Sequence, residues 1–161
     1  MGSLAAVPSS RASFHEEKTI AALTRPVQDS GTLDYVRPAH LEKHTLTPVE
    51  EDLVVDGERL TITRPAAHSV QTLNLEEQPE IRALVDTIRG TLAGDLGLLR
   101  RLYQVTLAGS QAAWRLTLVP TDGRLQRFLR VVWIDGAGAS LRAIDTVQVN
   151  GDRTRMTIDP S

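Results

Sequence analysis

The sequence predicts a mainly antiparallel β fold of the α+β class, in which one curved sheet is interrupted by an amphipathic helical insert. Two turn pairs, Asp56-Gly57 and Asn150-Gly151, each separate apolar runs and favour tight β-hairpins. Between these hairpins, residues 79–92 carry apolar side chains at helical spacing. A sheet with one dry face needs a cover, and the apolar stripe of this insert is suited to provide it.

Length and composition limit the class of protein. The 161 residues suit a single domain, and contents of 41% hydrophobic and 24% charged residues are typical of a globular chain. The formal net charge of −2 gives no reason to expect a nucleic-acid partner. The absence of Cys excludes disulfides, thiolate metal sites and Cys nucleophiles. No apolar run reaches the roughly 18 residues that a membrane-spanning helix needs.

The N-terminal residues are set apart from the rest of the chain. Residues 1–12 are expected to be a flexible tail or a cloning remnant, since Met1-Gly2-Ser3 looks like a vector scar. They lack the basic segment and the long apolar segment of an intact signal peptide, so we expect any native signal to be absent from this chain. Residues 13–161 are expected to form one domain.

Three segments in the first half predict strands. Residues 13–23 fit neither a helical nor a strand period cleanly, and we favour a strand. Residues 32–36 alternate, which places Leu33 and Tyr35 on one face. Residues 70–75 form a further short strand.

The most specific strand signal is the hairpin over residues 53–62. Asp56-Gly57 is the preferred dipeptide for a two-residue type I′ loop. With that loop, Leu53 lies opposite Leu60. One face of the predicted hairpin then carries Val55, Leu60 and Ile62.

Pro79 begins the predicted helix, where its missing N–H costs nothing, and Gly94 follows its end. Asp95 can cap a short second helix that runs to Leu102. The apolar stripe of the first helix consists of Ile81, Leu84, Val85, Ile88 and Leu92.

The rest of the chain is predicted to be rich in strands. Residues 103–107 and 114–118 alternate, whereas residues 128–134 are apolar on both faces. In the last hairpin, the turn at Asn150-Gly151 predicts that Val147 and Val149 face Met156 and Ile158. The opposite, wet face of that hairpin is assigned to Thr146, Gln148, Arg153 and Arg155.

No pattern in the sequence predicts a metal, cofactor or catalytic site. His40 and His44 flank Glu42, but prolines on both sides make the segment extended, which separates the two His side chains by about 13 Å. His68-Ser69 lacks the Gly-x-Ser-x-Gly context of a nucleophile elbow. Residues 136–141 lack the third Gly and the following helix of a dinucleotide loop.

Several segments share their order and spacing with one known family. They are Phe14-x-Glu16-x-Lys18, Gly31-Thr-Leu33-x-Tyr35-x-Arg37-Pro38, Leu41-Glu42-Lys43, Pro48, and Val55-Asp56-Gly57-x-x-Leu60. The later segments agree more loosely and are Trp114-x-Leu116-x-Leu118-x-Pro120, Asn150-Gly151-Asp152 and Thr154-x-Met156-x-Ile158. The chain thus resembles the LolA-type periplasmic carriers of outer-membrane lipoproteins.

This resemblance implies an unclosed β-barrel, or half-barrel, whose helical lid covers an apolar cavity for acyl chains. It also implies that the Arg of the Arg-Pro pair, Arg37, hydrogen-bonds to the lid and holds it shut. On this basis the expected cavity wall comprises Leu33, Tyr35, Leu60, Ile62, Leu73, Leu116, Leu118, Val131 and Trp133. The expected lid residues are those of the helical stripe.

The resemblance further implies a monomeric periplasmic protein, with an inner-membrane exporter as donor and an outer-membrane protein as acceptor. The chain departs from the main carriers in two places. Ala39-His40-Leu41 stands where they usually have aromatics, and the chain ends soon after Ile158 without their usual extension. It is therefore more similar to a LolA-related branch found beside fatty-acyl, aryl-polyene and glycolipid machinery, so the cargo is either a lipoprotein or another lipid or polyene.

Two other function classes are weighed against the carrier. A module that senses lipids or lipoproteins and signals to a partner would use the same scaffold, although such regulators normally carry a second domain. An esterase acting on a lipid would need a nucleophile and a base, and no such set is visible in the sequence. The carrier is the function that we expect, with no enzymatic activity and no cofactor.

Overall fold

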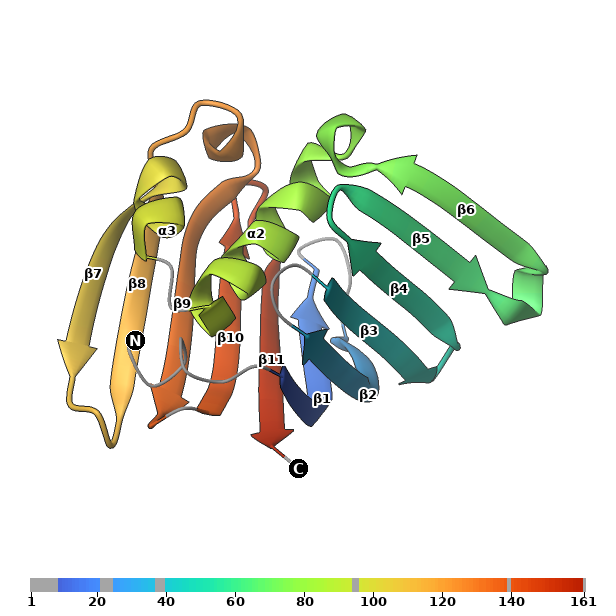
Figure 1. Ribbon diagram of the computed structural model, residues 1–161, viewed down its shortest axis with the longest axis horizontal. Helices are drawn as coiled ribbons and strands as arrows, with labels where there is room; N and C mark the ends of the chain where they lie inside the picture. Colours follow the sequence, from blue (N-terminus) through green and yellow to red (C-terminus); the bar gives the residue numbers. More distant parts are fainter. Residues whose placement is uncertain (1–8, 21–24, 37–39, 94–95, 139, 161) are drawn as a thin grey trace.

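The computed structural model describes residues 9–20, 25–36, 40–93, 96–138 and 140–160. Within these residues, eleven strands form a single sheet that is not closed into a barrel (Figure 1). The strands are β1 (Ser9–Thr19), β2 (Val27–Val36), β3 (His40–Thr47), β4 (Glu51–Asp56), β5 (Arg59–Arg64), β6 (Ser69–Asn74), β7 (Tyr103–Gly109), β8 (Trp114–Pro120), β9 (Leu129–Ala137), β10 (Ser140–Gln148) and β11 (Arg153–Pro160).

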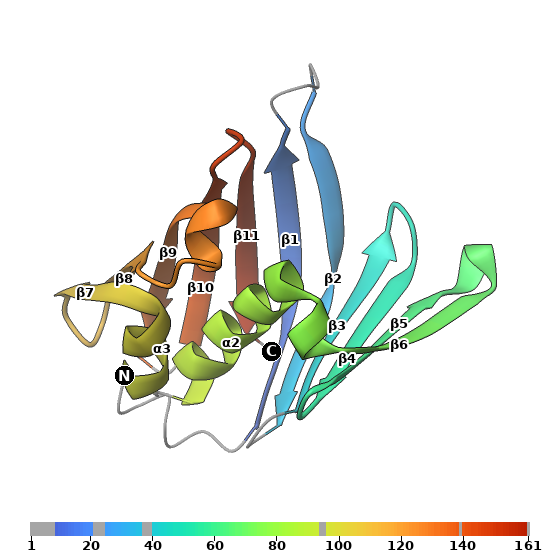
Figure 2. The same cartoon turned by 90° about the horizontal axis from the view of Figure 1, so that it is seen from above.

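Two α-helices, α2 (Pro79–Ala93) and α3 (Leu96–Leu102), lie against one face of the curved sheet (Figures 1 and 2). Neither helix is long and apolar enough to cross a membrane, and the same holds for every helix in the described residues. Three short 3₁₀ turns, η1 (Pro65–Ala67), η2 (Leu75–Glu77) and η3 (Leu125–Arg127), complete the described elements. The predicted half-barrel with a helical insert is confirmed.

The strand order is β6-β5-β4-β3-β2-β1-β11-β10-β9-β8-β7, and every neighbouring pair is antiparallel. The pairing of β1 with β11 joins the N-terminal and C-terminal halves of the chain at the centre of the sheet. Because the helical insert lies between β6 and β7 in the sequence, it crosses from one edge of the sheet to the other (Figure 1). This path places α2 over the concave face, where the core gathers.

Alternation along the strands decides which side chains meet the helices. In β2, Leu33 and Tyr35 are buried, and in β5 Leu60 and Ile62 are buried as well. In β8, Leu116 and Leu118 are fully buried. On the helical side, Val85, Ile88 and Leu99 complete the core. The predicted dry face and its cover are therefore both present.

Three sequence-based details are corrected by the structure. The predicted tail, residues 1–12, overlaps the first strand, because β1 begins at Ser9. The loop between β4 and β5 is Gly57-Glu58 rather than Asp56-Gly57, so Leu60 pairs with Val55 instead of Leu53. Gly57 has a φ of +62°, as required at the first loop position of a type II′ turn. Val55, Leu60 and Ile62 share one face, as predicted. The observed partner of Leu60 lies two residues from the predicted one, and such an even shift keeps every side chain on its face.

The last hairpin also differs from its prediction. Its loop contains four residues, 149–152, so Val147 pairs with Arg153 and Ile144 pairs with Met156. Thr146 and Gln148 therefore share the concave side with Met156, and Val147 lies with Arg153 and Arg155 on the convex side. A two-residue loop would pair Val147 with Thr154, so the prediction assigned the side chains of β10 to the wrong face of the sheet. The predicted cap Asp95 and the helix-ending Gly94 lie outside the described residues.

Candidate functional site

A cavity of about 210 Å³ lies between α2 and the concave face of the sheet. It is lined by strands β1, β9, β10 and β11 at the centre of the sheet and by the start of β7. Most of its wall is apolar. The apolar lining residues are Ile88, Tyr103, Phe128, Leu129, Val132, Ile144 and Met156.

One end of this cavity is polar. Glu16 has a relative exposure of only 4% and lies in it together with Lys18 and Lys43. Both Nζ atoms are 3.5 Å from Oε1 of Glu16, and Lys43 Nζ also lies 5.3 Å from the centre of the Phe14 ring. The period of two along β1 explains the position, because Glu16 points to the same side as buried Phe14. Three further polar residues, Thr146, Gln148 and Thr154, line the cavity.

Two arginines fasten α2 to the loop between β4 and β5. Arg89 donates from Nη2 to the carbonyl oxygen of Gly57 over 2.7 Å. Arg82 donates from Nη1 and Nη2 to the carboxylate of Glu58 over 2.7 and 3.0 Å. Burial lowers the pKa of Arg89, yet an Arg side chain keeps its charge in a protein. We call these two contacts, Arg89 with Gly57 and Arg82 with Glu58, the loop latch.

The opposite side of α2 is fastened to β7. The hydroxyl groups of Thr87 and Tyr103 lie 2.7 Å apart and share a hydrogen bond. Thr91 donates from Oγ1 to the backbone oxygen of Thr87 over 2.7 Å, which satisfies a second buried hydroxyl of the helix. Burial raises the pKa of Tyr103, so its hydroxyl stays protonated at neutral pH. The helix therefore contacts both halves of the open sheet through polar groups, and its apolar residues Val85 and Ile88 pack in the core.

The predicted wall residues are mostly buried, but in the packed core around the cavity. This group comprises Leu33, Tyr35, Leu60, Ile62, Leu116 and Leu118. Leu73 is partly buried against the same core. Among the predicted lid residues, Ile88 lines the cavity and Val85 is buried, whereas the side chains of Ile81, Leu84 and Leu92 lie outside the described residues. Their part in binding a cargo stays a prediction.

Two predicted wall residues point to the other side of the sheet. Leu118 pairs with Val132 and Leu116 pairs with Ile134, so Val131 and Trp133 lie on the convex face. Trp133 lines a surface depression there with Arg115, Asp145 and Arg155. Val132 lines the cavity on the concave side instead, and Ile134 is buried in the packed core. Both faces of residues 128–134 carry mostly apolar side chains, so periodicity could not decide which face meets the core.

The predicted gate, Arg37, lies outside the described residues, and its contact with the lid stays a prediction. Sequence reasoning missed Arg82 and Arg89, because charged residues on an amphipathic helix are expected to face water. It also missed Glu16, although a signal was present. The alternation Phe14-x-Glu16-x-Lys18 places all three side chains on one face of a strand.

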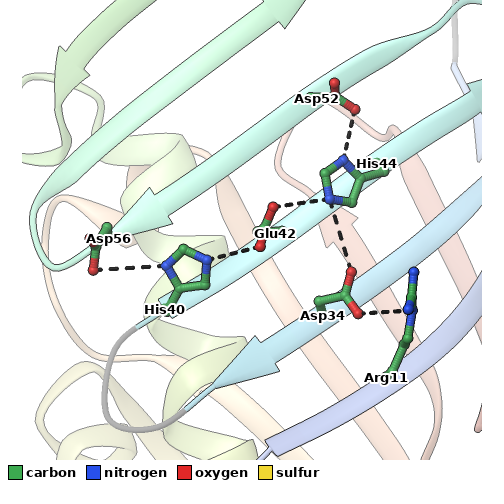
Figure 3. A network of polar contacts seen from close by, with 7 residues as sticks. All are labelled: Arg11, Asp34, His40, Glu42, His44, Asp52 and Asp56. Carbon is green, nitrogen blue, oxygen red and sulfur yellow. Dashed lines mark hydrogen bonds and ion pairs between the residues drawn. The ribbon is translucent and has the colours of Figure 1, made fainter.

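The His residues of β3 lie on the convex face, in a polar cluster that links β2, β3 and β4 (Figure 3). His44 Nδ1 lies 2.8 Å from Asp52 Oδ1, and its Nε2 lies 3.1 Å from Glu42 Oε1. His40 Nε2 lies 2.9 Å from Glu42 Oε2. No three His, Cys, Asp or Glu side chains in the described ranges are placed to hold a metal ion.

The His44 contacts predict a dependence of stability on pH. The hydrogen bond to Asp52 raises the pKa of His44 above 6.5, because it favours the protonated ring. The resulting stabilisation is fully present below pH 6.5 and is lost as the pH rises through the raised pKa. His44→Gln should therefore destabilise the protein by about 1 kcal/mol or less at pH 6, and by less at pH 8.5. Urea unfolding at both pH values measures this difference.

The matched control for that experiment is His15→Gln, since His15 has an exposed side chain on the convex side of β1. It removes an imidazole from the same face of the sheet and leaves the contacts of His44 intact. Equal pH dependence of wild-type protein and His44→Gln would contradict the assigned role of His44.

The hydrogen bond from His40 lowers the pKa of Glu42, so the stabilisation by that carboxylate is present above pH 4.5 and is lost as the pH falls through the lowered pKa.

Known proteins with similar sequences cover almost the whole chain. A family model described as outer membrane lipoprotein carrier protein LolA-like matches residues 1–159. The outer-membrane lipoprotein carrier protein of Pseudomonas fluorescens (strain Pf0-1) is 26% identical over 134 residues, which cover 83% of this chain. The chain spans 61% of the length of that curated relative.

Solved structures with a similar arrangement have low sequence identity. A LolA superfamily protein from Nitrosomonas europaea is 9% identical, with a TM-score of 0.44 over 94% of this chain and 84% of that one. The MucA/MucB complex of Pseudomonas aeruginosa contains a chain that is 13% identical, with a TM-score of 0.49 over 98% of this chain and 53% of that one.

Proposed function

The chain belongs to the LolA-like outer-membrane lipoprotein carrier family, and we propose that it carries an acylated or otherwise hydrophobic molecule in the cavity under α2. The observation that carries this proposal is the cavity itself, whose apolar wall lies beneath a helix that polar contacts hold in place. Binding requires no covalent step. Each buried methylene contributes about 0.8 kcal/mol, less the entropic cost of association.

Cargo entry requires α2 to move. A cavity of about 210 Å³ is smaller than the roughly 300–1,000 Å³ of ordinary small-molecule sites, so a long acyl chain needs more room than this state offers. The loop latch and the Thr87–Tyr103 hydrogen bond are the contacts that opening would break. Arg37 is proposed as a further lid contact on the strength of the family resemblance.

The proposed cellular setting is based on the family resemblance. We place the protein in the periplasm, where an inner-membrane exporter would supply the cargo and an outer-membrane protein would accept it. The cargo is a lipoprotein, through its acyl chains, or another lipid or polyene. The protein would act as a monomer and would need no cofactor.

A substitution on the cavity wall tests the proposal. Val132→Phe should weaken binding of a fluorescent fatty-acid probe about tenfold, because the ring occupies cavity volume that one or two methylenes would otherwise fill. Val131→Phe is the matched control, since this neighbouring side chain lies on the convex face. Fluorescence titration gives both dissociation constants, and circular dichroism confirms that both variants fold.

Equal binding by the two variants would contradict the assigned cavity. A wild-type protein that binds no acyl probe, and that co-purifies with a protein partner instead, would favour the sensing module over the carrier.

A further inference from the structure

We propose that Glu16 forms a head-group site at the polar end of the cavity, where it accepts a hydrogen bond from an uncharged amide N–H or hydroxyl group attached to the acyl chain of the cargo. This inference rests on the proposed carrier function and adds the chemical class of the cargo's polar end.

The first observation is the state of the Glu16 carboxylate. Its Oε1 atom is buried and accepts no hydrogen bond from the described residues. The Nζ atoms of Lys18 and Lys43 lie 3.5 Å away, which is longer than the usual 2.7–3.2 Å of an N–H···O hydrogen bond. A buried acceptor without a donor is costly, so a donor that enters the cavity gains more there than it would at an exposed carboxylate.

The second observation is the place of this atom in the cavity. Glu16 lines the same cavity as the apolar residues Ile144 and Met156. Met156 is the residue paired with Glu16 across β1 and β11, so the apolar wall begins directly beside the carboxylate. An amphiphile can therefore place its chain along the apolar wall and its first polar group at Oε1.

The third observation is the balance of charge, which favours an uncharged donor over an anion. Lys18 lies 3.5 Å from Asp29 Oδ2 as well as from Glu16, and Lys43 lies against the Phe14 ring. Two carboxylates thus already match the two ammonium groups. A bound anion would add a third negative charge beside a buried carboxylate, whereas an amide or hydroxyl adds none.

The test uses pairs of ligands in which a methyl group replaces the donor hydrogen. 1-Dodecanol is compared with 1-methoxydodecane, and N-methyldodecanamide is compared with N,N-dimethyldodecanamide. The two pairs separate a hydroxyl from an amide source. Displacement of a fluorescent fatty-acid probe gives each affinity, and dodecanoate is added as the anionic competitor.

In the wild-type protein, the donor-bearing member of at least one pair should bind about tenfold more tightly than its twin. Glu16→Gln should reduce this preference to about twofold, because the uncharged amide oxygen is a weaker acceptor. Glu17→Gln is the matched control, since Glu17 is the next residue and lies exposed on the other face of β1. It should keep the wild-type preference.

Other outcomes overturn the inference. Equal binding within both pairs would leave a carrier whose cavity recognises only the chain. If dodecanoate bound most tightly of all ligands, and Lys43→Gln abolished that preference, the polar end of the cavity would be assigned to an anion. Failure of all five ligands and of the probe would overturn the carrier function as well. If Glu16→Gln fails to fold, the comparison of the ligand pairs with the wild-type protein decides the proposal.

Discussion

Gly31→Ala is expected to lower the free energy of unfolding by more than about 3 kcal/mol. A Cβ atom at this position would lie 1.8 Å from the backbone oxygen of His44 and 2.8 Å from its carbonyl carbon. Those atoms cannot move away easily, because β3 is hydrogen-bonded to β2 on one side and to β4 on the other. The Phe14 ring, 3.0 Å from the same point, closes the remaining space above Gly31.

Urea unfolding monitored by circular dichroism measures this loss. Gly123→Ala is the matched control, since no heavy atom lies within 4 Å of a Cβ built there. The control should change the free energy of unfolding by no more than about 0.5 kcal/mol. A Gly31→Ala protein as stable as this control would mean that β2 and β3 can separate locally at little cost.

The same close approach has a consequence for the cavity. Gly31 pairs with Phe14 on one side and with Thr45 on the other, at a register shift between β2 and β3. Because Phe14 covers the glycine, Lys43 can lie against the outer side of its ring and reach toward Glu16. A side chain at position 31 would therefore disturb the polar end of the cavity as well as the sheet.

Sequence patterns predicted the fold where one face of an element is clearly apolar. Val85 and Ile88 in the stripe of α2, and the alternating residues 114–118, each belong to one apolar face, so their burial follows from their period. The patterns failed where both faces are apolar, as in residues 128–134, or where a loop length had to be assumed, as at residues 149–152. A single assumed loop residue changes which face a whole strand presents.

The candidate site was less predictable than the fold for a different reason. The cavity depends on how far α2 stands from the sheet, and no local pattern in the sequence encodes that distance. The alternation Phe14-x-Glu16-x-Lys18 puts Glu16 on the face of Phe14, but its polar neighbours His15 and Glu17 make the segment look like a solvated strand. Only the pairing of β1 with two other strands shows that Glu16 is central and buried.

Arg89→Met is expected to speed uptake of a fluorescent fatty-acid probe about tenfold. The hydrogen bond from Arg89 to Gly57 is charged at the donor and partly buried, and such bonds contribute about 1.5–3 kcal/mol. A loss of about 1.4 kcal/mol in the closed state makes opening tenfold more frequent. Met replaces the aliphatic part of the Arg side chain with a stem of similar length. Stopped-flow fluorescence measures the uptake rate.

Arg82→Met should have a smaller effect, below about fivefold. Its partner Glu58 is 55% exposed, and exposed ion pairs contribute roughly 0–1 kcal/mol. Arg100→Met is the control for loss of a positive charge near the lid, since Arg100 is exposed on α3 and lies outside the loop latch. The expected order of uptake rates is Arg89→Met, then Arg82→Met, then Arg100→Met at the wild-type rate. An unchanged rate in Arg89→Met would show that this contact does not limit opening.

Substitutions in the loop latch and on the cavity wall are expected to change the affinity for cargo in opposite directions. If cargo binds only when α2 has moved, the measured dissociation constant equals the intrinsic one divided by the fraction of open protein. While that fraction is small, Arg89→Met must tighten binding by the same factor by which it increases opening. A wall substitution such as Val132→Phe acts on the intrinsic constant instead and weakens binding. Faster uptake without tighter binding in Arg89→Met would therefore mean that the cargo-bound protein keeps the Arg89 contact, with α2 closed over its cargo.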